Sequence, residues 1–251
     1  MQRSATDPGF RGLGRARREL RPPPSRPLEN REAAGRLLAA QAAPLGLVSP
    51  VALGIPRGGV PVARPLADAL GAPLDVLVVR KLGAPGDPEY GLGAVAEGGV
   101  VQLDEARARA AGFPRAELEP EIQRELLEVS ERVARYRGGR PLPSLRGHTV
   151  YVVDDGVATG GTFETGLIAV RQHAPDRVVA ALGVAPGDAV ARLHRLADEV
   201  LVALVPDHLE AVGQWYRDFG PVPEAEVLEL LERGARLPGD PPGTTSGPPL
   251  A

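Results

Sequence analysis

The sequence predicts an α/β fold, with a mainly parallel sheet flanked by helices on both faces. Short, wholly apolar runs alternate with segments of helical periodicity from about residue 30 to residue 233. Strands that are apolar throughout are typical of parallel sheets, because helices cover both of their faces. The chain has 251 residues, 43% of them hydrophobic, which is enough for one substantial core. In such sheets ligands bind beyond the carboxyl ends of the strands.

The first half of the chain contains two apolar strands and the helices around them. Asn30 is a candidate N-cap for a first helix. Strands are expected at residues 51–55 and 74–79, with a helix at residues 60–70 between them. A glycine- and proline-rich stretch follows at residues 83–99 and is expected to be a loop.

The second half continues the alternation. A long helix is expected at residues 115–137, where apolar residues recur every three or four positions. A third strand is expected at residues 150–153, and a helix follows it at residues 162–173. The segments that continue the pattern of strands and helices are residues 178–184, 190–196, 200–205 and 224–233.

Both ends of the chain differ from this middle part. Residues 1–26 contain seven arginines against two acidic residues and show no apolar periodicity, so we predict a disordered basic leader over residues 1–27. The last stretch, residues 237–251, contains five prolines and is predicted to be a disordered tail. The predicted domain therefore covers residues 28–236.

Composition excludes several classes of function. The formal net charge is only -3, which gives no general electrostatic case for binding nucleic acid or an anionic membrane. Cysteine is absent, so a disulfide, a thiolate metal site and a cysteine nucleophile are all excluded. No apolar run is long enough to cross a bilayer. We expect a cytoplasmic protein that has neither a nucleic-acid nor a membrane partner.

The end of the third strand carries the strongest signal for a binding site. Asp154 and Asp155 follow the apolar strand, and a Thr-Gly-Gly-Thr turn at residues 159–162 then opens a helix. Glycines allow close backbone approach, and the N–H groups at a helix N-terminus bind anions such as phosphate. Adjacent carboxylates can accept hydrogen bonds from the vicinal hydroxyls of a sugar or hold a divalent cation. A phosphate site beside a diol site describes ribose 5-phosphate.

Residues 150–162 resemble, at every position, the signature with which type I phosphoribosyltransferases bind phosphoribosyl pyrophosphate (PRPP). The resemblance implies the fold of that family, with a small hood region. It also implies that Asp154 and Asp155 hold the ribose hydroxyls and contact Mg²⁺ indirectly, through ribose or water. The residues that it assigns to the 5-phosphate loop are Ala158, Thr159, Gly160, Gly161 and Thr162.

Two earlier segments are similar to other parts of the same family, in the same order along the chain. The turn after the first strand is similar to the family's pyrophosphate loop, in which Arg57, Gly58 and Gly59 would face the diphosphate. Arg80 and Lys81 follow the second strand and are similar to the basic pair and mobile catalytic loop of orotate-type members. Lys81 is also the only lysine in the chain, although the chain has 29 basic residues.

The resemblance implies an Mg²⁺-dependent enzyme that transfers ribose 5-phosphate from PRPP to a small nitrogenous base, giving a nucleoside 5-monophosphate and pyrophosphate. Lys81, Arg80 and Asp155 are the expected catalytic residues, and a homodimer is the habit of the family. The alternative is a non-catalytic protein that senses PRPP or a nucleotide, since one fold can serve both uses. A mobile loop favours the enzyme, because a sensor has no need to exclude water.

Overall fold

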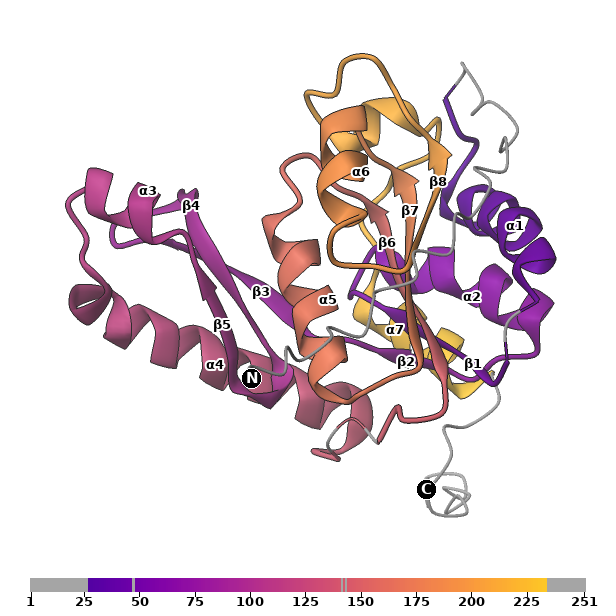
Figure 1. Cartoon of the computed structure of the whole chain (residues 1–251), viewed down its shortest axis with the longest axis horizontal. Coiled ribbons are helices and arrows are strands. Elements are labelled where there is room, and N and C mark those ends of the chain that lie inside the picture. The colour runs from indigo at the N-terminus through magenta and orange to yellow at the C-terminus, as the bar shows by residue number, and fades with distance from the viewer. Residues whose placement is uncertain (1–26, 47, 141, 143, 234–251) are drawn as a thin grey trace, which may run out of the picture.

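The computed structural model describes residues 27–46, 48–140, 142 and 144–233, and it places them in a main body and a smaller lobe (Figure 1). The predicted tail, residues 237–251, and the predicted leader except for its last residue lie outside the described part of the chain. In that described part, no helix is long and apolar enough to cross a membrane.

The main body is built on five parallel strands in the order β2-β1-β6-β7-β8. Their bounds are β2 Leu74–Val76, β1 Pro50–Gly54, β6 Thr149–Gly156, β7 Arg177–Val184 and β8 Glu199–Leu204. The predicted parallel sheet is confirmed. The order of the strands reverses between β1 and β6, and such a switch point opens a crevice at the carboxyl ends of the two strands.

Helices cover both faces of this sheet, as its apolar strands require (Figure 1). One face carries α1 (Arg31–Ala42), α2 (Gly59–Leu70) and α7 (Glu224–Glu232), and the other carries α5 (Gly161–Gln172) and α6 (Gly187–Leu193). Strand β6 contributes side chains to the hydrophobic core on each face of the sheet, because successive side chains of a strand point to opposite faces. Tyr151 and Val153 are buried with α1 and α2, whereas Val150 and Val152 are buried with α5 and α6.

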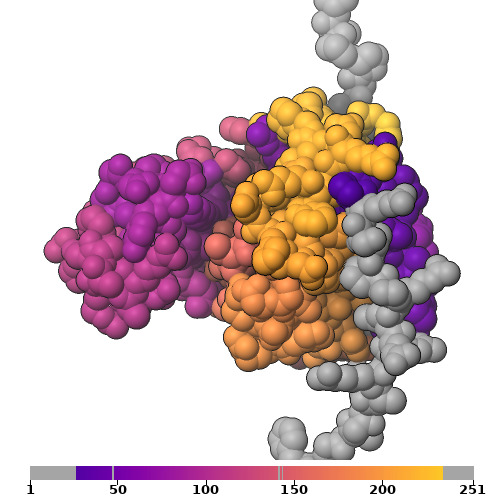
Figure 2. Space-filling view, turned by 90° about the horizontal axis from the view of Figure 1, so that it is seen from above, coloured from indigo at the N-terminus to yellow at the C-terminus, as the bar shows by residue number. Residues whose placement is uncertain are grey.

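The lobe contains a second sheet, which is antiparallel, with the strand order β3-β4-β5. Figure 2 shows it projecting from one side of the body. The strands and helices of the lobe are β3 Val79–Ala84, β4 Asp87–Ala96, β5 Val100–Leu103, α3 Glu105–Ala110 and α4 Arg115–Arg137. Short 3-10 helices complete the described structure at Ala43–Leu45, Glu97–Gly99 and Val212–Trp215.

The prediction of a single strand at residues 74–79 and a loop at residues 83–99 was wrong. The chain leaves the main sheet after Val76, and β3 and β4 form a hairpin with a tight turn at Gly86, whose φ is +79°. Glycine obscured the strands in the sequence because it weakens strand propensity. Glycine is nevertheless required at position 93, because a Cβ at Gly93 would overlap the carbonyl of Gln102 on β5.

Most other predicted elements lie within one to three residues of their observed bounds. The largest shifts are of three residues, and one of them is at α6, which begins three residues before the predicted helix at residues 190–196. Pro186 is the N-cap of α6, and Asp188 lies in the first turn of the helix. A negative charge there interacts favourably with the helix dipole, which favours a start before residue 190. Strand β6 extends three residues beyond its predicted end and includes Asp154 and Asp155. The strand β5 and the helix α3 were not expected.

Candidate functional site

The two acidic residues at the end of β6 lie at the centre of the candidate site. Asp154 and Asp155 are partly buried, and the Oδ1 atom of Asp154 accepts a hydrogen bond of 2.8 Å from the backbone N–H of Asp155. The hydroxyl of Tyr216 donates to the Asp155 carbonyl at 2.6 Å. The acid pair is therefore fixed both by its own backbone and by a residue near the end of the described chain.

Arg31 is a site residue that the sequence analysis did not identify. Its Nε atom lies 2.8 Å from the Oδ2 atom of Asp155, and its Nη1 atom donates to the Gly220 carbonyl at 2.8 Å. The guanidinium also lies 3.9 Å from the centre of the Phe219 ring, which stacks on Tyr216. No local pattern could have revealed this contact, because 124 positions separate Arg31 from Asp155.

The electrostatics of the pair differ between its two members. Burial raises the pKa of Asp154 well above its ordinary value, and the neighbouring charge of Asp155 raises it further. Burial also raises the pKa of Asp155, although the hydrogen bond and charge of Arg31 act in the opposite direction. A hydroxyl donor or a cation at Asp154 would relieve this cost, so the pair is suited to bind one of them.

We predict that Asp154→Asn stabilises the ligand-free protein at neutral pH. A carboxyl whose folded-state pKa is raised makes the fold lose stability as the pH rises from the unfolded pKa through the folded one. The neutral amide avoids that loss, so the melting temperature at pH 7.5 should rise by roughly 2 to 4 °C, or about 1 kcal/mol.

The measurement is a pair of thermal melts at pH 7.5 and pH 4, with Glu117→Gln as the control that removes an exposed carboxyl of the lobe. The gain of Asp154→Asn should shrink at the lower pH, where the wild-type carboxyl binds its proton. A gain of equal size at both pH values, or a loss at pH 7.5, would contradict the prediction.

The predicted pyrophosphate loop lies directly against the acid pair. Arg57 is exposed, and the Pro56–Arg57 peptide bond is cis. A Cβ at Gly58 would overlap the carboxylate of Asp155, and one at Gly59 would overlap the carbonyl of Val153. The two glycines therefore allow this loop to approach β6 closely. The structure brings the predicted diphosphate and ribose sites together at the switch point.

Gly58→Ala tests this close approach. The added methyl group has to displace the Asp155 carboxylate from Arg31, so we expect the melting temperature to fall by several degrees, in line with overpacking of roughly 1 to 3 kcal/mol. Gly187→Ala is the matched control, because a Cβ there meets nothing within 4 Å. Equal melting temperatures for the two variants would show that the loop yields without cost.

The predicted phosphate loop joins β6 to α5. Ala158 and Thr159 are exposed, and Gly160 has a φ of +88°, a left-handed conformation that favours glycine. Gly161 and Thr162 form the first turn of α5, where N–H groups have no partners within the helix. The side chain of Arg192 on α6 donates to the Thr159 carbonyl at 2.7 Å. In the sequence, Arg192 is recognisable only as a partner of Asp188 at i,i+4 spacing on a helix. This spacing does not predict the hydrogen bond of Arg192 to the phosphate loop.

The basic pair lies in the lobe and makes its described contacts there. Arg80 is 2.6 Å from Glu125 and 3.8 Å from Glu128, both on α4. The Nζ atom of Lys81 donates to the Glu89 carbonyl at 2.6 Å and lies 3.2 Å from its carboxylate. The pair lines a polar cavity of about 410 Å³ between the hairpin and α4. Arg80 and Lys81 are thus not in contact with the acid pair in this arrangement.

The two basic side chains point to different faces of the lobe sheet. Arg80 points to the face covered by α4, as its ion pairs show. Lys81 is the next residue on the strand and therefore belongs to the opposite face. On that face Val79 and Ala94, the cross-strand neighbour of Lys81, are buried in the same core as α5. Strand alternation therefore directs the Lys81 side chain to the face of the hairpin that meets the body, while the residue also borders the cavity along the edge strand β3.

The arrangement at the switch point corresponds to a known family. A family model for the phosphoribosyl transferase domain matches residues 28–202, more than two thirds of the chain. The chain belongs to this family. The match covers both the segment of the acid pair and the glycine turn at Gly58 and Gly59.

Similar proteins include two from Mycobacterium tuberculosis, one from strain CDC 1551 and one from strain H37Rv. The names of both describe them provisionally as phosphoribosyl transferases. Each is 43% identical over 208 residues, which cover 83% of this chain and 47% of the relative. The chain thus spans about half the length of these relatives. The crystal structure of TT1426 from Thermus thermophilus is 47% identical, covering 83% of this chain and 100% of that one, with a TM-score of 0.70.

The side chains at the switch point set limits on a metal site. Among residues 27–46, 48–140, 142 and 144–233, no group of three or more His, Cys, Asp or Glu side chains could hold a metal ion. Mg²⁺ often takes only one or two protein carboxylates and completes its shell with water and substrate phosphates. Asp154 and Asp155 therefore fit a cation that arrives with a phosphorylated substrate.

Proposed function

We propose that this phosphoribosyl transferase domain transfers ribose 5-phosphate from PRPP to a nitrogenous base and releases pyrophosphate. The observation that carries the proposal is the meeting of three parts at one switch point. These parts are the acid pair of β6, the glycine turn that opens α5, and the Gly58 turn packed against Asp155. Together they offer acceptors for a ribose diol, N–H donors for a phosphate and a close backbone for a diphosphate.

In the proposed complex each part has one role. Asp154 and Asp155 accept hydrogen bonds from the ribose hydroxyls, and their negative charge favours the positive charge that develops on the ribose as pyrophosphate departs. The N–H groups of the turn from Ala158 to Thr162 bind the 5-phosphate. The proposed catalytic contribution of Asp155 is thus electrostatic and requires no proton transfer.

Negative charge builds on the pyrophosphate as it departs, so the part of the site that holds the pyrophosphate needs positive charge. Arg57 is exposed beside the diphosphate turn and supplies part of this charge. Mg²⁺, held by Asp154 and Asp155 indirectly through ribose or water, would neutralise diphosphate oxygens when bound. We propose Lys81 as a further charge contact that the β3–β4 hairpin carries towards the body. Arg80 would assist from the α4 face, where Glu125 and Glu128 now hold it.

The test is an assay of pyrophosphate release by purified protein with PRPP, Mg²⁺ and a panel of purine and pyrimidine bases, alongside calorimetric titration with PRPP. Base-dependent pyrophosphate release supports the proposal and names the acceptor. PRPP binding without release for any base would instead support the sensor. Failure to bind PRPP at all would overturn both the transferase and a sensor of PRPP.

A further inference from the structure

Arg192 lies on α6, outside every segment to which the proposed function assigns a role, yet its guanidinium is bonded to the phosphate loop. Its Nη2 atom donates to the Thr159 carbonyl at 2.7 Å, its Nε atom to Glu164 at 3.1 Å and its Nη1 atom to Asp188 at 2.7 Å. Each nitrogen of the guanidinium thus has its own acceptor. The loop, the first turn of α5 and α6 are held together by this one side chain.

The bond to Thr159 determines the direction of the next amide. The C=O and N–H groups of a trans peptide point in opposite directions. With the Thr159 carbonyl directed at Arg192, the Gly160 N–H points away from α6, to the other side of the loop. Gly160 can follow because it adopts a left-handed φ of +88°. The N–H groups that open α5 come next in the chain, so Arg192 holds the loop in an anion-binding conformation.

Arg192 also balances a charge that would oppose a phosphate. Glu164 belongs to the first turn of α5, and its Oε1 atom would lie 3.1 Å from a Cβ placed on Gly160. An unpaired carboxylate so near the loop would repel a phosphate dianion. The ion pair of Arg192 with Glu164 reduces that repulsion and keeps the carboxylate on the α6 side.

We infer that Arg192 is a positioning residue for the 5-phosphate subsite, through its hold on the Thr159 carbonyl and its ion pair with Glu164. The inference rests on the proposed function, since it assigns the subsite to ribose 5-phosphate. Arg192 uses its donors on the protein and leaves the phosphate to the loop amides. Its loss should therefore weaken phosphate binding selectively and leave the diphosphate site intact.

The experiment uses two probes that occupy different parts of the proposed site. Ribose 5-phosphate and inorganic pyrophosphate, each with Mg²⁺, are titrated calorimetrically into the wild type and into Arg192→Ala. We expect the affinity for ribose 5-phosphate to fall roughly tenfold, the size of one lost hydrogen bond to a charged group. The affinity for pyrophosphate should stay within about twofold, and KM for PRPP should rise more than kcat falls.

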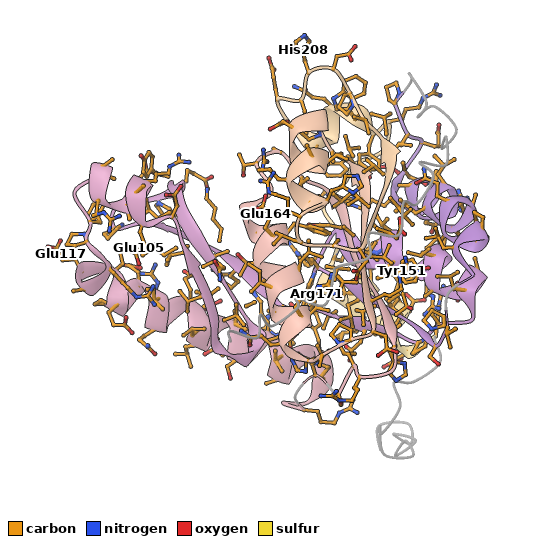
Figure 3. All side chains as sticks on the ribbon, in the orientation of Figure 1. Glu105, Glu117, Tyr151, Glu164, Arg171 and His208 are labelled. Carbon is orange, nitrogen blue, oxygen red and sulfur yellow. The ribbon has the colours of Figure 1, made fainter. Side chains whose placement is uncertain are left out.

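Arg171→Ala is the matched control, because Arg171 also bonds a carbonyl, that of Leu196, and a carboxylate, that of Asp198. Figure 3 shows Arg171 on α5 at a different turn from Glu164, away from the phosphate loop. This variant should bind both probes like the wild type. Glu164→Gln added to Arg192→Ala should recover part of the lost affinity, because it removes the carboxylate that Arg192 had balanced.

The outcomes separate the inference from the proposed function. If the wild type binds ribose 5-phosphate and Arg192→Ala binds it equally well, or loses both probes equally, the positioning role is overturned and the proposed function stands. If the wild type binds neither ribose 5-phosphate nor PRPP, both fail. Should Arg192→Ala not fold in a thermal melt, Arg192→Lys replaces it. That variant keeps the positive charge but cannot make the three hydrogen bonds of Arg192 in the same geometry. We expect it, too, to lose affinity for ribose 5-phosphate and to keep its affinity for pyrophosphate.

Discussion

The double variant Asp154→Asn with Asp155→Asn is expected to lose Mg²⁺-dependent binding of PRPP while it remains folded. In the proposed complex the two carboxylates accept the ribose hydroxyls and assist the cation. A hydrogen bond to a charged group contributes roughly 1.5 to 3 kcal/mol. The loss of two such bonds therefore weakens binding by roughly 10² to 10⁴-fold, enough to abolish a measurable calorimetric signal at micromolar protein.

The fold should survive this change because two opposing effects accompany it. The amide at position 155 still offers an oxygen to Arg31, although the ion pair between the two side chains is lost. At the same time, the variant removes the cost of burying two negative charges, and this burial is what raises the pKa of both carboxyls in the wild type. A melting temperature close to that of the wild type, together with lost binding, is the expected combination.

The matched control removes two carboxylates that are remote from the site. Glu105 and Glu117 belong to the outer part of the lobe in Figure 3 and are exposed. Glu105→Gln with Glu117→Gln should leave PRPP affinity unchanged and bring the same change in net charge. If the aspartate variant is folded and binds PRPP with wild-type affinity, the ribose assignment of the acid pair is wrong.

Lys81→Ala is expected to lower turnover by roughly 10²-fold, in line with the loss of one transition-state charge contact, with a smaller effect on PRPP affinity. Lys81 is held within the hairpin by a hydrogen bond of 2.6 Å to the Glu89 carbonyl and by an ion pair of 3.2 Å with the Glu89 carboxylate. Its side chain is 41% exposed, and surface contacts of this kind restrain a side chain only weakly. The hairpin face to which it belongs meets the body. In the proposed mechanism Lys81 releases Glu89 and contacts the leaving group when substrate is bound.

Steady-state kinetics with PRPP and the identified base, together with PRPP titration, check this prediction. Lys81→Arg should recover only part of the activity, because a planar guanidinium does not replace a compact ammonium group. Arg124→Ala is the control from the same cavity, since Arg124 is an exposed cation of α4. Equal losses of turnover and affinity in Lys81→Ala would indicate uniform binding in place of a transition-state role.

The parts of the fold that could be predicted are those whose pattern is local. The strands of the main sheet are apolar at every position, and residues such as Val150 and Tyr151 are buried on opposite faces. The lobe escaped prediction because its strands contain Gly91, Gly93 and Pro88, which weaken a strand in isolation. Pairing across the hairpin and packing against α4 and α5 override that weakness, and neither is visible in a short window.

The candidate site divides in the same way. The acid pair lies at the end of an apolar strand and each glycine turn comes soon after one, so a short stretch of sequence was enough to place them at one edge of the sheet. Arg31, Tyr216 and Arg192 reach the same edge from other elements and depend on the tertiary fold for their contacts. Their side-chain types are ordinary for a surface helix or a core, and their positions along the chain carry no distinguishing pattern.

The contact between the two ends of the described domain has a consequence for how the site forms. The N–H of Leu28 donates to the Trp215 carbonyl at 2.8 Å, and the N–H of Arg217 donates to the Leu28 carbonyl, also at 2.8 Å. This pairing brings Arg31 to Phe219 and lets Tyr216 reach Asp155. During synthesis the parallel sheet can assemble once β8 has emerged, but Tyr216 and the residues that contact Arg31, Phe219 and Gly220, emerge only later. A product that stops after β8 would therefore have the sheet but lack the contact of Tyr216 with the acid pair.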